Sequence, residues 1–292
     1  MSNDSVRPGR SSAKDTPGEV TYPEIEDRLR RSAEPLGKPQ LGDWLAHHPE
    51  KGQSFRQYLA AKPVRRSAEL STIYLCLIGE FDEPQQRVVD RTAEYLALFY
   101  DVPVVVRRRV SFCDIPLRAK RKHPEWGDKQ LLSTYLLYEV LEPDRPTDAL
   151  AYLALTARDL WPGDGWNFLF GQADFRRRVG VWSLYRNGYP GPGEAAYRLC
   201  LRRTAMIAAH ETGHILTMRH CTAHACLMNG CNHQEEQDRQ SPTLCPVCLR
   251  KLCWNLQVEP ISYLRRLAAF HRAHGLSGSD WLESAAIALE RE

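Results

Sequence analysis

Residues 210–228 read HETGHILTMRHCTAHACLM, and residues 245–248 read CPVC. His210 and His214 lie four positions apart, about 40° around a helix, so both imidazoles leave the same helix face. His220 can return as a third ligand if the chain leaves the helix in between. Three histidines leave one tetrahedral position on zinc open for water, which is the arrangement of a catalytic site.

The cysteines that follow predict a second metal site. Cys221-x4-Cys226 and Cys245-x2-Cys248 supply four thiolates, a closed coordination typical of structural zinc. Three further residues of this stretch remain alternative ligands that the spacing favours less: His224, Cys231 and His233. The sequence therefore predicts two zinc ions per chain, one catalytic and one structural.

The whole stretch resembles the signature of the archaemetzincins, zinc peptidases of the metzincin clan. Their pattern is H-E-x-x-H-x-x-G-x-x-H-C, then x4-C-x-M, then C-x-x-C after a gap of roughly seventeen residues. This chain, in which the last gap is one residue shorter, matches at His210, Glu211, His214, His220, Cys221, Cys226, Met228, Cys245 and Cys248. The resemblance implies a zinc-dependent peptidase whose specificity is poorly defined.

The chemistry of these residue types suggests their roles. Neutral His210, His214 and His220 would hold Zn²⁺, which acidifies water and polarises a carbonyl. Glu211, beside the first histidine, would accept the water proton and pass it to the leaving amine. Met228 resembles the methionine of the metzincin turn below the metal, although an ordinary core methionine is the alternative.

Thr217 departs from the family pattern, which has glycine after the second histidine. Glycine there would take the left-handed conformation that ends the helix and turns the chain toward His220. A β-branched residue at positive φ is a strained outlier. We expect Thr217 to lie in a differently shaped turn at negative φ; the alternative is a strained backbone held by the two metal sites.

Three other readings of the motif compete with this one. Glu235 and Glu236 lie where a rival zincin class takes a glutamate as third ligand, but Gln234–Asp238 looks like a solvated loop. A crosslink-repair type of protease combines H-E-x-x-H with a zinc ribbon, whose paired C-x-x-C knuckles fit C-x4-C poorly. A zinc-dependent peptide- or nucleic-acid-binding protein without catalysis would have no use for Glu211.

Composition points to an intracellular globular enzyme. A length of 292 residues suffices for one large or two modest domains. The content of 43% hydrophobic and 26% charged residues is ordinary for a globular protein. Nine cysteines, five of them between 221 and 248, favour metal binding over disulfides, so we expect Cys76, Cys113, Cys200 and Cys253 to be buried thiols. No secretory signal or membrane span is evident, which predicts a cytoplasmic protein.

The charge pattern gives little reason to expect nucleic acid as a partner. The net charge is +3, and the basic runs at Arg107–Arg109, Lys120–Lys122 and Arg176–Arg178 look like solvated strand ends and loops. A cleft wall favouring acidic peptides is the alternative for these runs. We expect a monomer that acts on a peptide or protein substrate.

The chain divides into a disordered tail (1–24), an N-terminal appendage (25–70) and a peptidase domain (71–292). The last comprises the sheet with the active-site helix (71–216) and a zinc-stabilised C-terminal subdomain (217–292). Apolar runs and periodicity predict the following elements: strands at Ile73–Ile78, from Val104, Leu150–Leu155, Asn167–Gln172 and Val179–Tyr185; helices at Ile25–Ser32, Pro84–Tyr100, Leu131–Leu141, Glu194–Leu216, Pro260–His274 and Ser279–Glu290.

The expected fold is α/β, a metzincin-like twisted mixed sheet backed by helices. In the active-site helix, Leu199, Met206, Ile207 and Leu216 would pack beneath the sheet. The last two predicted strands form a hairpin, and in zincins an edge strand pairs with the substrate backbone. Phe168, Phe170 and Gly171 are therefore candidate substrate-binding residues, with an ordinary structural hairpin as the alternative.

Overall fold

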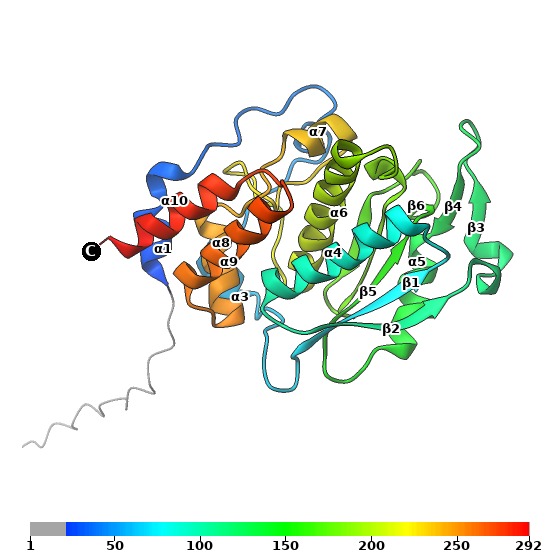
Figure 1. The fold of residues 1–292 in the computed structure, drawn as a ribbon, viewed down its shortest axis with the longest axis horizontal. Helices are drawn as coiled ribbons and strands as arrows, with labels where there is room; N and C mark the ends of the chain where they lie inside the picture. Colours follow the sequence, from blue (N-terminus) through cyan, green and yellow to red (C-terminus); the bar gives the residue numbers. More distant parts are fainter. Residues whose placement is uncertain (1–21, 292) are drawn as a thin grey trace, which may run out of the picture.

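The computed structural model describes residues 22–291, so most of the predicted disordered segment 1–24 lies outside the described residues. Helix α1 (Pro23–Arg28) begins within that segment. The fold is the predicted α/β arrangement, a twisted mixed sheet with helices packed around it (Figure 1).

The central sheet has five strands in the order β2-β1-β5-β8-β7. Strands β1, β2, β5 and β8 pair in parallel, whereas β7 is antiparallel to β8 and forms one edge. The strand bounds are β1 Thr72–Ile78, β2 Val104–Val110, β5 Ala149–Thr156, β7 Gly171–Asp174 and β8 Val179–Ser183. The predicted hairpin is present, but its first strand begins at Gly171 rather than at Asn167.

Strand β5 lies at the centre of the sheet and is buried on both faces. All eight of its residues are buried, because helical segments cover both faces of the sheet. Leu153 and Leu155 point into the core beneath α4 and α6, while Tyr152 and Ala154 point into a second core on the opposite face. The period-2 alternation of a strand therefore buries apolar side chains on both sides.

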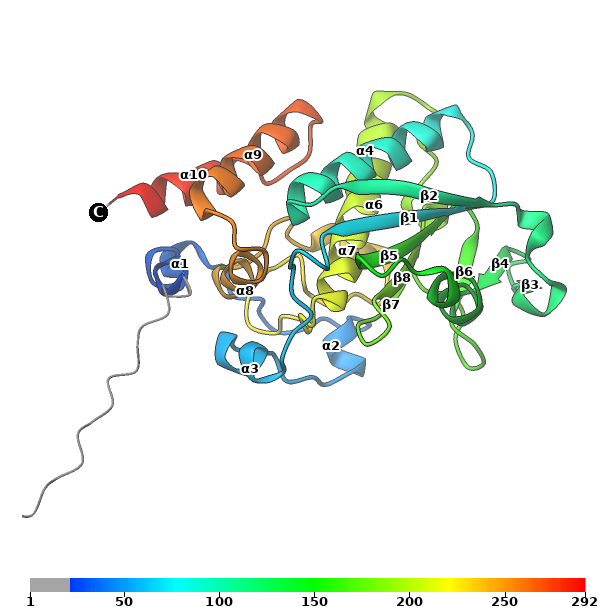
Figure 2. The same cartoon turned by 90° about the horizontal axis from the view of Figure 1, so that it is seen from below.

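Helices α4 (Glu83–Tyr100) and α6 (Glu194–Ile215) pack on the same face of this sheet (Figure 2). Asp82 begins α4 with a capping box in which Gln85 is the reciprocal partner. Helix α6 lies against β7 and β8. Of the residues predicted to pack it, Ile207 and Leu216 are buried and Met206 is partly buried, but Leu199 is 42% exposed.

A second sheet of three strands was not predicted. Its order is β3-β4-β6, with bounds β3 Lys120–Lys122, β4 Lys129–Leu132 and β6 Asp159–Trp161. Leu131 lies between Lys120 and Leu160 in this sheet, so the helix predicted over 131–141 is wrong at its start. After the short α5 (Ser133–Tyr135), a π-helical turn (Leu136–Leu141) covers the far face of the central sheet.

The appendage and the C-terminal subdomain pack together. Helices α1 and α3 of the appendage contact α8, which carries Cys248 (Figure 2). The remaining helix bounds are α2 Trp44–His47, α3 Phe55–Ala60, α7 Gln234–Arg239, α8 Pro246–Leu256, α9 Pro260–Ala273 and α10 Ser279–Glu290. Short 3-10 turns span Arg30–Ser32, Phe112–Asp114, Leu117–Ala119, Glu142–Asp144 and Tyr185–Asn187. Helix α7 replaces the loop predicted over Gln234–Asp238, since His233 caps its first turn.

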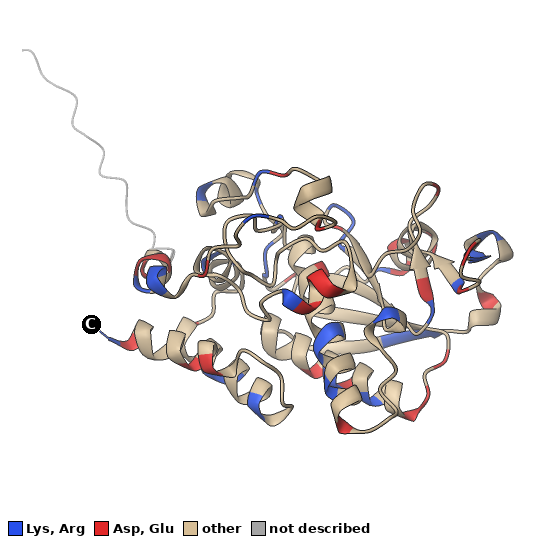
Figure 3. Ribbon diagram, turned by 90° about the horizontal axis from the view of Figure 1, so that it is seen from above, with Lys and Arg blue, Asp and Glu red and all other residues tan. Residues whose placement is uncertain are grey.

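Charged residues of both signs are interspersed over the described part of the chain (Figure 3). The arginines 107–109 lie inside β2 rather than at its end, and Arg107 pairs with Asp144. Cys113 is exposed, which corrects the prediction of a buried thiol. Within residues 22–291, none of the helices combines the length and the apolar character needed to cross a bilayer.

Candidate active site

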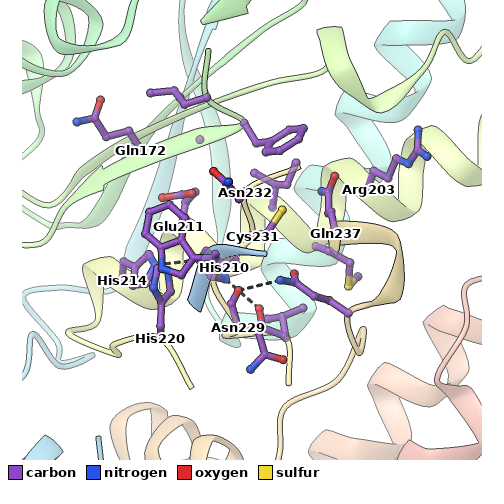
Figure 4. Close-up of a pocket in the computed structure, with 18 of the residues that line it drawn as sticks. Gln172, Arg203, His210, Glu211, His214, His220, Asn229, Cys231, Asn232 and Gln237 are labelled. Atoms are coloured by element: carbon purple, nitrogen blue, oxygen red, sulfur yellow. Dashed lines mark hydrogen bonds between the residues drawn. The ribbon is translucent and has the colours of Figure 1, made fainter. Parts of the chain in front are cut away.

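The three histidines of the motif converge although only two lie on the same helix. Helix α6 carries His210 and His214, and His220 returns from the turn that follows the helix. One ring nitrogen from each lies within 4.8 Å of the other two. Figure 4 shows the three rings turned toward one another beside Glu211. The structure therefore brings together the predicted histidine set.

Hydrogen bonds determine which nitrogens face the centre. The Nδ1 atoms of His210 and His214 lie 2.9 Å from the Leu227 carbonyl and 2.7 Å from the Met218 carbonyl. A carbonyl only accepts, so each Nδ1 carries the proton and donates it. The two Nε2 atoms, both unprotonated, face each other at 2.9 Å. Opposed lone pairs at this distance suit a shared cation, since zinc binds imidazole nitrogen at about 2.0–2.1 Å.

His220 is oriented by a residue that the sequence did not suggest. Its Nδ1 lies 2.9 Å from Oε2 of Glu50 and 3.1 Å from Oε1. Glu50 belongs to the N-terminal appendage, 170 positions away. An outer carboxylate or carbonyl on the second ring nitrogen is the usual companion of a metal-binding histidine. All three rings of the set therefore have such a partner.

Burial controls the protonation of the site. Burial, with the neighbouring histidines, lowers the pKa of His210 well below its ordinary value, and it lowers the pKa of His214 to about 4. Both rings are therefore neutral at neutral pH, as metal ligands must be. Burial raises the pKa of the Glu211 carboxyl to about 8.

Glu211 lies against the edge strand of the sheet. A Cβ at Gly171 would stand 2.7 Å from Cγ and Oε1 of Glu211, so only glycine leaves room for the carboxylate. The structure thus places two of the predicted residues together, one on α6 and one at the start of β7. The place of Gly171 in the predicted hairpin gives no sign of this contact, which joins residues 40 positions apart.

A cavity of about 530 Å³ opens beside the histidines and Glu211. The edge-strand region and the helix residues Met206 and Ile207 line it with apolar side chains, whereas Arg202, Arg203 and the segment after Met228 line it with polar ones. Trp44, Phe168, Phe170, Gly171 and Cys231 are among the residues that line it. Phe168 and Phe170 pack edge to face with centroids 5.4 Å apart. The cavity is large enough for several side chains of a peptide.

Met228 packs beneath the active-site helix. It is 1% exposed, and a Cβ at Gly213 would lie 2.7 Å from its Sδ atom. The absence of a side chain at Gly213, between the two histidines, therefore leaves the space that Met228 occupies. Its carbonyl also accepts a 2.7 Å hydrogen bond from the backbone N–H of Cys221. Met228 therefore contacts both helix α6, at Gly213, and the segment after His220, at Cys221.

Thr217 has φ +69°, so the expectation of a turn at negative φ is wrong. Helix α6 ends in a Schellman motif: Thr217 N–H donates to the His214 carbonyl at 2.8 Å, and Met218 N–H donates to the Gly213 carbonyl at 3.0 Å. This motif needs a left-handed residue at position 217, which overrides the steric preference of threonine. The Thr217 Oγ1 atom accepts a 3.1 Å hydrogen bond from Val64 N–H, which offsets part of the strain.

Thr217→Gly should be more stable than Thr217→Ala. Both variants lack the Oγ1 acceptor, but only alanine keeps a Cβ at positive φ. We expect the free energy of unfolding of the alanine variant to be lower by about 1 kcal/mol. Urea unfolding of both zinc-loaded variants measures the difference. An alanine variant that is equally or more stable would contradict a strained position.

The four predicted cysteines form a second buried group. Cys221, Cys226, Cys245 and Cys248 place their sulfurs within 4.8 Å of one another. The backbone N–H groups of Met228 and Cys245 donate to the Cys226 sulfur at 3.4 and 3.3 Å. Hydrogen bonds from the neighbouring thiols hold the pKa of Cys221 well below its usual range. Buried sulfurs that accept N–H donors suit thiolates on a closed zinc site.

The alternative ligands of the sequence lie outside both groups. His224 is in neither, and Cys231 lines the cavity. His233 and Glu236 form a further group with Asp43. The carboxylates of this group already accept hydrogen bonds: Arg239 donates to Asp43, and the backbone N–H groups of Trp44 and Asn232 donate to Glu236. Glu235 bonds His233 and is 80% exposed. Neither glutamate joins the three histidines.

Comparison with known proteins agrees with this geometry. A family model described as peptidase family M54 matches residues 76–253. Archaemetzincin-2 of Mus musculus is 32% identical over 254 residues, covering 75% of this chain and 69% of the mouse protein; the Homo sapiens protein is 31% identical over 250 residues with the same coverage. The crystal structure of archaemetzincin from Methanopyrus kandleri superposes with a TM-score of 0.53 at 27% identity, covering 66% of this chain and 99% of the archaeal chain.

Proposed function

This chain belongs to peptidase family M54, the archaemetzincins, and is a zinc metallopeptidase, and we propose that His210, His214 and His220 hold the catalytic zinc and that Glu211 is the general base. The observation that carries the proposal is the convergence of three ring nitrogens next to a buried carboxylate. A second zinc, on Cys221, Cys226, Cys245 and Cys248, is structural.

Zinc held by His210, His214 and His220 would supply Lewis-acid activation of a water molecule and of the scissile carbonyl. Burial raises the pKa of Glu211, and a cation held by the histidines would favour its ionised form. Glu211 then accepts the proton of the attacking water and delivers it to the leaving amide nitrogen. The N–H donors to the Leu227 and Met218 carbonyls keep the two helix histidines in the ligand tautomer.

The substrate is a peptide that lies along the edge of the sheet. Strand β7 is an edge strand whose outer side has backbone groups available for pairing. Gly171 borders Glu211, and Phe168 and Phe170 line the same cavity, which supports all three as substrate-binding residues. The monomeric state and the cytoplasmic location stay predictions from the amino-acid sequence.

Zinc stoichiometry tests the two-site proposal. Two separate ligand sets should give two zinc ions per folded chain, and the four-thiolate site should release its ion to chelators more slowly because it is closed and buried. Elemental analysis of undialysed protein, followed by timed chelator extraction, measures both properties. One zinc per folded chain would refute this assignment.

Peptide hydrolysis tests the activity itself. Zinc-loaded protein incubated with a mixed peptide library should produce new N-termini, and chelator treatment should stop their appearance. A protein that holds zinc at the histidines but cleaves nothing would favour the alternative of a zinc-dependent binding protein.

A further inference from the structure

The N-terminal appendage contacts the active site although it lies before the residues matched by the M54 family model, which begin at 76. Its residues 44–64 run along the turn between the second and the third histidine. These contacts join residues far apart in the sequence, so they are not visible in the spacing of any motif.

Glu50 makes the most direct of these contacts. Both of its carboxylate oxygens lie within 3.1 Å of the His220 Nδ1 atom. Trp44 holds the carboxylate from the other side, because its Nε1–H donates to Oε1 of Glu50 at 2.6 Å. The same indole packs edge-on against the His220 ring, with centroids 5.3 Å apart. His220 is therefore fixed by a hydrogen bond and by an aromatic wall, both from the appendage.

Trp44 is itself held in place. Its backbone N–H donates to both oxygens of Glu236 at 3.0 Å. A Cβ at Gly230 would lie 2.4 Å from the indole, so the chain after Met228 is shaped to receive the ring. The Trp44 ring also lines the cavity beside the histidines. Trp44 is therefore fixed in place, and its hydrogen bond fixes the position of the Glu50 carboxylate.

The appendage also holds the backbone that leads to His220. Gln53 donates through Nε2 to the Thr217 carbonyl and accepts through Oε1 from Arg219 N–H, both at 3.2 Å. The Tyr58 hydroxyl donates to the Leu216 carbonyl at 2.9 Å. These bonds span the residues on either side of the strained Thr217. The turn that presents the third histidine is therefore shaped by the appendage as well as by the helix end.

We infer that the appendage is part of the zinc site and that Glu50 is the positioning residue of His220, an inference that rests on the proposed function. With the Nε2 atom of His220 directed to the metal, Nδ1–H donates to the Glu50 carboxylate. This fixes the ring orientation and makes the ring a stronger ligand. Glu50 touches neither substrate nor metal, and its effect passes through His220.

The size of the effect follows from exposure. Outer-shell partners of metal-binding histidines typically contribute about 10–100-fold to metal affinity. The Glu50 side chain is 30% exposed, so water can partly replace it. We therefore expect the lower end, a loss of about 10-fold in zinc affinity at the histidine site.

The experiment compares Glu50→Ala, Glu50→Gln and the control Lys51→Ala in the full chain. Lys51 is an exposed charged residue of the same loop, so its loss changes the local charge without removing the carboxylate. Competition with a chromogenic chelator gives the zinc affinity of each site, and the cysteine site is the internal reference. Glu50→Gln keeps the shape and one acceptor oxygen, so it should fold and should lose less affinity than Glu50→Ala. The peptide KM at saturating zinc should stay unchanged.

The outcomes separate the two proposals. Zinc affinity at the histidine site within twofold of wild type for both Glu50 variants overturns the inference and leaves the proposed function intact. An equal loss in Lys51→Ala also overturns it, because the loop charge would then be the cause. Wild-type protein that binds zinc only at the cysteines refutes the proposed function itself, and the inference with it.

Discussion

Glu211→Ala should lower peptide hydrolysis by at least about 10²–10⁴-fold while zinc stays bound at both sites. The carboxylate lies beside the histidines but is not one of the three converging ligands, so its loss removes proton transfer and not metal binding. Removal of a buried carboxyl whose pKa is raised to about 8 also removes a desolvation cost, so the variant should fold at least as well. The measurements are kcat/KM on a cleaved peptide and zinc content by elemental analysis.

Glu235→Gln is the matched control for this variant. Glu235 is a highly exposed glutamate after Met228, in the region where a rival zincin class takes its third ligand. The structure pairs it with His233, so its replacement should change neither zinc content nor rate. A Glu211→Ala variant as active as wild type would contradict the assigned mechanism. A loss of catalytic zinc in Glu235→Gln would instead revive the rival ligand set.

Replacing Cys245 and Cys248 together with serine should impair the histidine site, although neither cysteine belongs to it. The closed zinc site is expected to contribute folding energy and to fix the chain around Cys221, the neighbour of His220. A misplacement of about 1 Å in a catalytic group can cost about 100-fold in rate. We therefore expect lower zinc affinity at the histidines and a loss of hydrolysis of that order in protein that still folds.

Two structural connections carry this coupling. Cys221 N–H donates to the Met228 carbonyl, and Met228 packs beneath Gly213 between the two helix histidines. On the other side, Lys251 of α8 donates to the backbone carbonyl and Oε1 of Gln53, which in turn bonds the backbone of Thr217. Loss of the thiolates would therefore disturb the histidine site by two routes, one through Cys221 and Met228 and the other through a shift of α8.

Cys253→Ala is the control for the double variant. Cys253 is a fully buried thiol on the same helix but lies outside the four-sulfur group. Its truncation should cost some stability while both zinc ions and the rate are retained. Wild-type zinc affinity and rate in the double serine variant, measured in folded protein, would show that the two sites are mechanically independent.

The local features of this protein follow from its amino-acid sequence alone. The four-residue spacing of His210 and His214 places both rings on one face of α6 because a helix repeats every 3.6 residues. The C-x4-C and C-x2-C spacings identified the four sulfurs that meet, and uninterrupted apolar runs identified β1 and β5 as buried strands. The family resemblance rested on the same short stretch, and the match of the M54 family model to residues 76–253 confirms the family.

Features that depend on residues far apart in the chain arise from tertiary packing. The Schellman motif imposed φ +69° on Thr217 against its own preference, because the hydrogen bonds of the helix end and of the appendage outweigh the strain of one residue. Leu131 lies in a strand because the backbones of β3 and β6 pair with it on either side. Glu50 faces His220 across 170 positions, a contact set by how the appendage packs on α8. Periodicity reports only the faces of single elements, whereas these contacts arise from the packing of one element on another.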